Sequence, residues 1–244
     1  MPRHRSSRRW RDRLPGRKPE EHFHWRGKEV NRLENLADAV FGFSLTLLVV
    51  AQQVPTDFDG LMKVMRGFPA FVASFALLIV FWNAHYRFFR RYGLEDGFTR
   101  VINYLILLMV MFSVYPLKFL FNSWLGGQGG MRTMDELNLV YRIYGVGLAA
   151  VWVSFGLLYW HALRKRDELQ LNAVEVEFTR LDLAGIRINI GTCFVSVLLS
   201  FLPVPLWLPG MVYGTLGITM AWNGARFGRR IAALIAARQQ EPAE

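Results

Sequence analysis

The chain alternates long apolar stretches with short charged segments. Each apolar stretch is about as long as a helix must be to cross the roughly 30 Å hydrocarbon core of a bilayer, which takes about 20 residues. A soluble protein built from so many buried helices would lack the amphipathic sequence needed to cover them. The pattern therefore predicts an all-α integral membrane protein with six transmembrane helices and no soluble domain, at residues 31–54, 67–89, 101–124, 139–163, 181–202 and 206–227.

Charges in the loops indicate the orientation of these helices. The 29 Lys and Arg outnumber the 19 Asp and Glu, and most of the basic residues lie before the first span and in alternate connections after it. Because basic loops stay in the cytoplasm, we expect a multi-pass protein of the inner (plasma) membrane with both termini cytoplasmic. The same pattern divides the chain into a disordered basic tail at 1–27, a six-span unit at 28–230 and a C-terminal tail at 231–244.

The basic N-terminal tail has other interpretations. Its charge would suit a DNA-binding arm, which contacts phosphates, and the Arg8-Arg9 pair is similar to a twin-arginine export signal. A simpler interpretation is that the charges hold the N-terminus inside and contact anionic lipids. We therefore expect the lipid bilayer, and not nucleic acid, to be the partner.

The composition argues against catalysis. Hydrophobic residues make up 52% of the chain and charged residues 20%, and the single cysteine, Cys193, excludes a disulfide framework or a Cys-rich metal site. The sequence contains no phosphate-binding loop, dinucleotide fingerprint or His-Glu-x-x-His motif. His161, near Asp167 and Glu168, is the one acid–base candidate, and solvation at the membrane surface explains it. We expect that the protein is not an enzyme and that it has no catalytic residue, metal site or cofactor.

Ionisable and polar side chains within the spans are costly in lipid, so each needs a partner or a path to water. Several of them fall near the cytoplasmic ends of the first three spans under the topology above. We expect one interhelical network of Arg32, Asp38, Trp82, His85 and Asn103. Separate anchoring of each side chain at the membrane interface is the alternative.

The first span also has one face that follows helical spacing. Ala39, Phe43, Thr46, Leu47 and Val50 recur at intervals of three and four residues. By spacing alone this stripe is an ordinary packing surface.

The first three spans resemble a known family. The segment Arg32-x-x-x-Leu36-Ala37-Asp38, followed by Thr46-Leu47-Leu48, is similar to the signature helix of the transmembrane protein 175 potassium channels, in which the pattern is Arg-x-x-x-Phe-Ser-Asp. Phe81-Trp82-x-x-His85 in the second span and Asn103 in the third also resemble that family.

The resemblance implies a homotetrameric, potassium-permeable cation channel whose pore is lined by the first helix of each subunit. Phe43, Leu47 and Val50 match the hydrophobic layers of the constriction, and Thr46 matches a hydroxyl position associated with the ion. The permeant potassium ion would be its only bound species. Two features depart from the family: Leu36-Ala37 replaces Phe-Ser, and Phe43 stands where Ile or Leu is usual.

The alternative function is a non-channel membrane protein, either a small-solute transporter or a structural subunit. An inverted repeat would favour a transporter. The last three spans, however, contain nothing similar to the Arg-x-x-x-Leu-Ala-Asp opening of the first.

Overall fold

The structure is a computed structural model and describes residues 23–27, 29–50, 54–125, 134–205 and 207–240. In these residues the chain is helical, without strands. The helices are α1 (Arg32–Val50), α2 (Phe58–Tyr92), α3 (Gly97–Leu125), α4 (Met134–Arg164), α5 (Ala173–Leu199), α6 (Leu208–Met211), the 3₁₀ helix η3 (Val212–Thr215) and α7 (Leu216–Gln240). The all-α membrane architecture predicted from the sequence is thereby confirmed.

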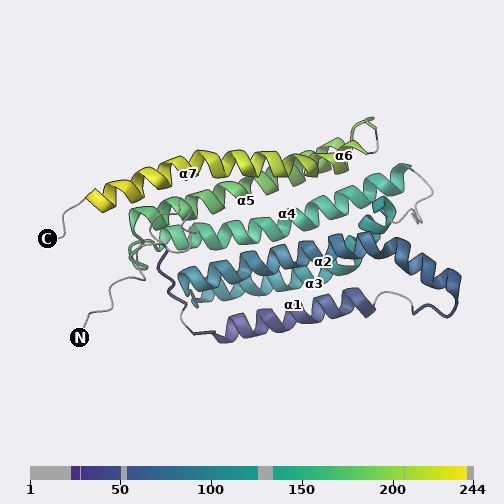
Figure 1. Cartoon of the computed structure of the whole chain (residues 1–244), viewed down its shortest axis with the longest axis horizontal. Coiled ribbons are helices and arrows are strands. Elements are labelled where there is room, and N and C mark those ends of the chain that lie inside the picture. The colour runs from purple at the N-terminus through teal and green to yellow at the C-terminus, as the bar shows by residue number, and fades with distance from the viewer. Residues whose placement is uncertain (1–22, 28, 51–53, 126–133, 206, 241–244) are drawn as a thin grey trace, which may run out of the picture.

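The long helices lie side by side with alternating direction (Figure 1). Helix α1 forms one edge of the bundle, α2 and α3 follow, then α4 and α5, and α7 forms the opposite edge. As a result α1 begins, and α7 ends, at the same end of the bundle.

Within the described residues, five helices are long and apolar enough to cross a membrane, and they correspond to the first five predicted spans. The sixth predicted span has a different form, because α6 and η3 precede α7 instead of one continuous helix. Helix α7 carries Arg226, Arg229 and Arg230, so its apolarity falls below that of the other five. It still runs antiparallel to α5 and packs along it.

Capping residues set helix boundaries that the apolar pattern does not show. Asp57 accepts a hydrogen bond from the Gly60 N–H at 2.6 Å and starts α2 well before residue 67. Asn172 and Glu175 form a capping box that starts α5 at Ala173, eight residues before the predicted boundary. Both helices therefore extend beyond their apolar cores.

The two predicted tails differ in how much of them the structure describes. Residues 1–22 and 241–244 lie outside the described residues. Residues 23–27, which we name the strap, pack on the bundle with the Phe23 side chain buried. The segment from residue 231 continues α7 to Gln240, because Ile231 is buried and Leu234 and Ile235 pack on the core one turn later.

Basic residues gather at the end of the bundle where α1 begins. The Gly27 N–H donates to the Arg90 carbonyl at 3.2 Å, and the Arg230 guanidinium lies 3.6 Å from Glu177. These contacts bring together the strap, the end of α2, the start of α5 and the end of α7. We name this the basic end, formed by residues 23–27, 29–32, 85–100, 160–180 and 226–240.

Candidate functional site

Helix α1 packs on α2 and α3 through one face and leaves the other uncovered. Its buried positions include Ala37, Phe41, Ser44 and Leu48, which recur every three or four residues. The opposite face is left open by the part of the chain that the structure describes. A largely apolar helix with one open face requires lipid or another chain to cover it.

The four candidate pore residues divide between this open face and its margin. Phe43 is 53% exposed and Val50 70%, and Thr46 is exposed as well. The Thr46 hydroxyl donates to the Gly42 carbonyl at 3.0 Å, a common arrangement on helices. Leu47 is half-buried and packs against the subunit's own core. The described residues of its own subunit thus leave more than half of the Phe43 side chain uncovered.

Two polar pairs join the first three helices. The Trp82 indole N–H donates to the Asp38 carboxylate at 2.8 Å and connects α2 to α1. His85 Nε2 and Asn103 Oδ1 lie 2.7 Å apart and connect α2 to α3 in the buried core. Because a carbonyl oxygen only accepts, His85 carries its proton on Nε2 in this contact.

Arg32 lies outside both pairs. It is exposed at the start of α1 and makes no hydrogen bond or ion pair with the part of the chain that the structure describes. The five network candidates therefore occur as an α1–α2 pair, an α2–α3 pair and one exposed arginine. The aromatic ring of Phe41 lies 6.0 Å from that of His85, so the two pairs adjoin across the α1–α2 contact.

The strap is fixed to α5 by a buried carboxylate. Glu175 pairs with Arg26 at 2.9 Å, and its side chain is only 1% exposed. It also accepts from the backbone N–H groups of His24, at 2.7 Å, and Asn172, at 3.0 Å. The carboxylate is thereby satisfied on several sides, as a buried charge must be.

The strap approaches α2 closely as well. A Cβ on Gly27 would lie 2.6 Å from the Phe89 carbonyl oxygen, so this position has room only for glycine. Gly93, which ends α2 with φ at 59°, lies against the same segment. The residues leading into α1 are therefore held by backbone contact and by charge.

Another polar cluster closes the loop between α2 and α3. Asp96 accepts from the Thr99 N–H at 2.8 Å and starts α3, while His161 and Lys165 contact its other oxygen at 2.7 and 3.0 Å. Burial raises the pKa of Asp96, but the hydrogen bonds from His161, Thr99 and Lys165 outweigh it and hold that pKa well below its usual range. His161 thus pairs with Asp96, and not with Asp167 or Glu168.

The sequence pattern gives no indication of the ion pairs that cross between helices. Arg91 of α2 pairs with Asp182 of α5, besides the pairs of Arg26 and Asp96. In these pairs and in Arg230–Glu177 the partners are separated by 53 to 149 positions, so spacing gives no signal for them. The one visible signal is Asn172-x-x-Glu175, which has the capping-box spacing.

Comparison with known proteins decides the family. The family model described as the endosomal/lysosomal potassium channel TMEM175 matches residues 32–114, which are α1, α2 and most of α3. A potassium channel of Marivirga tractuosa is 36% identical over 189 residues, covering 72% of this chain and 75% of the relative. The chain belongs to the TMEM175 potassium channel family.

Solved structures agree with the fold. The crystal structure of a variant of the potassium channel MtTMEM175, in complex with a nanobody fusion protein, aligns with a TM-score of 0.72 at 30% identity. It covers 87% of this chain and 97% of that one. A protein from Chamaesiphon minutus, described as a homologue of the lysosomal potassium-selective channel TMEM175, aligns with a TM-score of 0.55 at 24% identity, covering 80% of this chain and 96% of that one.

Membership in this family confirms the resemblance seen in the first three spans. The protein is a multi-pass membrane protein of a channel family, not an enzyme. The non-channel alternative is therefore not supported.

Proposed function

We propose that the chain is the subunit of a homotetrameric, potassium-permeable channel, with the open face of α1 lining the pore. The observation that supports this most directly is the exposure of Phe43, Thr46 and Val50 on a helix that the family model covers. The relatives named above are described as potassium channels. Four copies of α1 around one axis would cover the face that each subunit leaves open.

The constriction is hydrophobic in this proposal. The sequence has no Thr-Val-Gly-Tyr-Gly motif, so the ring of backbone carbonyls that this motif provides in other potassium channels is not available here. Phe43 and Val50 form apolar layers, with Leu47 at their margin, and an ion crosses them by losing part of its water. The Thr46 hydroxyl oxygen keeps acceptor capacity after donating to Gly42, so it can contact the ion.

The polar pairs position the pore helix. Asp38–Trp82 fixes α1 to α2, and His85–Asn103 fixes α2 to α3. Both pairs lie towards the basic end, away from the Phe43–Val50 half of α1. They act as support for the constriction and do not themselves contact the ion.

The basic end faces the cytoplasm in this proposal, with both termini on that side of the inner membrane. The connections at this end carry the excess of arginine and lysine, which is typical of cytoplasmic loops.

The test is ion flux in liposomes containing the purified protein, with potassium and sodium compared. Phe43→Ala removes four rings from one layer of a tetramer, and Phe43→Asn adds groups that can replace water around an ion. We expect both variants to raise flux and to weaken discrimination between the two ions. Phe112→Ala, at an exposed phenylalanine of α3, is the matched control and should leave flux unchanged.

A different result is expected if Phe43 does not face the pore. If Phe43 packs on a neighbouring helix, Phe43→Ala creates a cavity that costs about 3–5 kcal/mol, and flux does not rise. Unchanged flux with a large loss of thermal stability would therefore exclude Phe43 as the constriction.

A further inference from the structure

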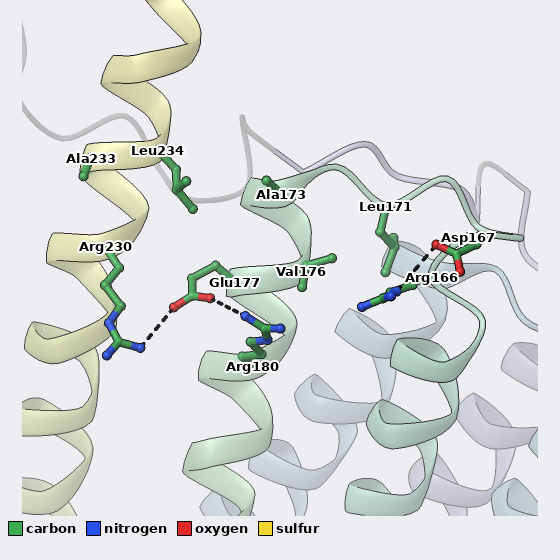
Figure 2. Close-up of a pocket in the computed structure, with 10 residues that line it drawn as sticks. All are labelled: Arg166, Asp167, Leu171, Ala173, Val176, Glu177, Arg180, Arg230, Ala233 and Leu234. Carbon is green, nitrogen blue, oxygen red and sulfur yellow. Dashed lines mark hydrogen bonds and ion pairs between the residues drawn. The ribbon is translucent and has the colours of Figure 1, made fainter.

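A groove opens at the basic end between the start of α5 and the last turns of α7 (Figure 2). Its volume is about 700 Å³. It is far from the open face of α1, since α7 forms the opposite edge of the bundle. The groove therefore takes no part in the proposed ion path.

Three arginines reach into this groove. Arg180 of α5 and Arg230 of α7 lie on either side of Glu177, at 3.4 and 3.6 Å from its carboxylate, and Arg166 lies 3.5 Å from Asp167 (Figure 2). The side chains of all three arginines are more than half exposed. A guanidinium has five N–H donors, so each of these exposed arginines retains several donors besides those of its ion pair.

The remaining walls of the groove are apolar. They come from the turn before α5, the first turn of that helix and the end of α7: Leu171, Ala173, Val176, Ala233 and Leu234. A site with guanidinium donors on one side and an apolar wall on the other matches a ligand that has an anionic head and an apolar body.

An aromatic and basic pair on α7 indicates where the membrane surface meets this helix. Trp222, which is 62% exposed, precedes Arg226 by one turn of α7, and the guanidinium lies 5.6 Å from its ring. Exposed tryptophan next to arginine is typical of the boundary between hydrocarbon and headgroups. Arg230 lies one further turn towards the basic end, where lipid phosphates would be.

We propose that this groove binds the phosphate of an anionic phospholipid. Arg180 and Arg230 donate to the phosphate oxygens, Arg166 supplies a third set of donors, and the apolar wall receives the upper part of an acyl chain. Arginine suits this role because its planar fork donates two parallel hydrogen bonds to phosphate. The proposal concerns lipid binding and does not depend on conduction.

The experiment measures lipid binding to the purified full-length chain in uncharged detergent. Phosphatidylglycerol and phosphatidylcholine are titrated separately, with retained lipid counted by native mass spectrometry and thermal melting followed in parallel. We expect phosphatidylglycerol to bind more tightly and to raise the melting temperature further. Arg180→Gln and Arg230→Gln should each weaken this binding about fivefold, as expected for one arginine at a lipid surface.

Matched variants separate the site from general surface charge. Arg229→Gln makes the same change on the same helix outside the groove and should leave binding unchanged. Ala233→Trp places a large side chain in the groove at its apolar wall without changing any charge, and it should weaken phosphatidylglycerol binding as well. Each arginine variant leaves Glu177 with its other arginine, so we expect the variants to fold; if they do not, Ala233→Trp tests the groove alone.

Three results would each overturn the proposal. The first is an equal effect of Arg229→Gln, which would indicate unspecific charge attraction. The second is stabilisation by inorganic phosphate as large as that by phosphatidylglycerol, which would indicate a site for a free anion. The third is a folded Ala233→Trp variant that binds phosphatidylglycerol as the parent does.

Discussion

Replacing Glu175 by glutamine tests whether a buried ion pair holds the strap that leads into α1. The side chain keeps its size and loses its charge. Its partner Arg26 lies 2.9 Å away and is itself 16% exposed, so it would remain next to α5 without a counter-charge. Removing one member of a buried pair typically costs about 3–5 kcal/mol.

The expected loss here is smaller because Arg26 has other acceptors. Its guanidinium also donates to the carbonyls of Leu169, at 2.7 Å, of His24, at 2.9 Å, and of Gln170, at 3.2 Å. We therefore expect Glu175→Gln to lower the free energy of unfolding by about 2–3 kcal/mol. For a chain of this length the melting temperature should fall by roughly 4–12 °C.

Thermal melting of the purified protein is the assay, with Glu168→Gln as the control. Glu168 is an exposed carboxylate paired with Lys165 in the same loop, and its loss should change little. Arg26→Gln should destabilise too, and the double variant should lose less than the sum of the two single losses. If Glu175→Gln melts with the parent, or if the losses add, the strap is not held by this pair.

Two further predictions concern other contacts. A Cβ on Gly145 of α4 would overlap a methyl group of Val197 on α5, so Gly145→Ala should lower the free energy of unfolding by about 1–3 kcal/mol. Gly147→Ala is the control, because a Cβ there meets open space and should leave thermal melting unchanged. If the two variants melt at the same temperature, α4 and α5 do not approach closely at Gly145. The lowered pKa of Asp96 stabilises the folded state at every pH above the ordinary range of aspartate, near 4. This contribution begins to be lost as the pH falls through that range and is gone below the folded pKa. The melting temperature of the parent should therefore fall more steeply between about pH 5 and pH 3 than that of Asp96→Asn, which keeps an acceptor for the Thr99 N–H. If the melting temperatures of the two proteins fall in parallel, Asp96 does not stabilise the fold through its charge.

The helices and the family could be predicted from the sequence because both depend on local patterns. The length of the apolar segments predicts the membrane helices. The spacing of Arg32, Asp38, Trp82 and His85 resembles that of the family signature. The helix ends were less predictable, since Asp57 and the Asn172–Glu175 capping box extend α2 and α5 into polar sequence. Hydrophobicity indicates which part of a helix lies in lipid, whereas capping residues determine where the helix starts.

The functions of individual basic residues could not be predicted, because charge counts treat all of them alike. Arg91 pairs with Asp182, Arg26 is bound to Glu175, and Arg180 and Arg230 face an open groove. All four contribute to the charge asymmetry that indicated the topology. Which arginine is a structural partner and which is available to a ligand depends on contacts between distant segments.

The contacts of α1 with its own subunit differ between the two halves of the helix. Near the basic end, the strap, Asp38 and Phe41 fix the helix to α2 and α5 by charge, hydrogen bonding and burial. Towards Val50 it rests on its own subunit mainly through Ser44 and Leu48, while its opposite face stays open. A helix held firmly at one end and half-covered at the other needs lipid or another chain to cover its far half. In the proposed tetramer this cover comes from the other α1 helices, so assembly would determine both the stability of this half and the width of the pore.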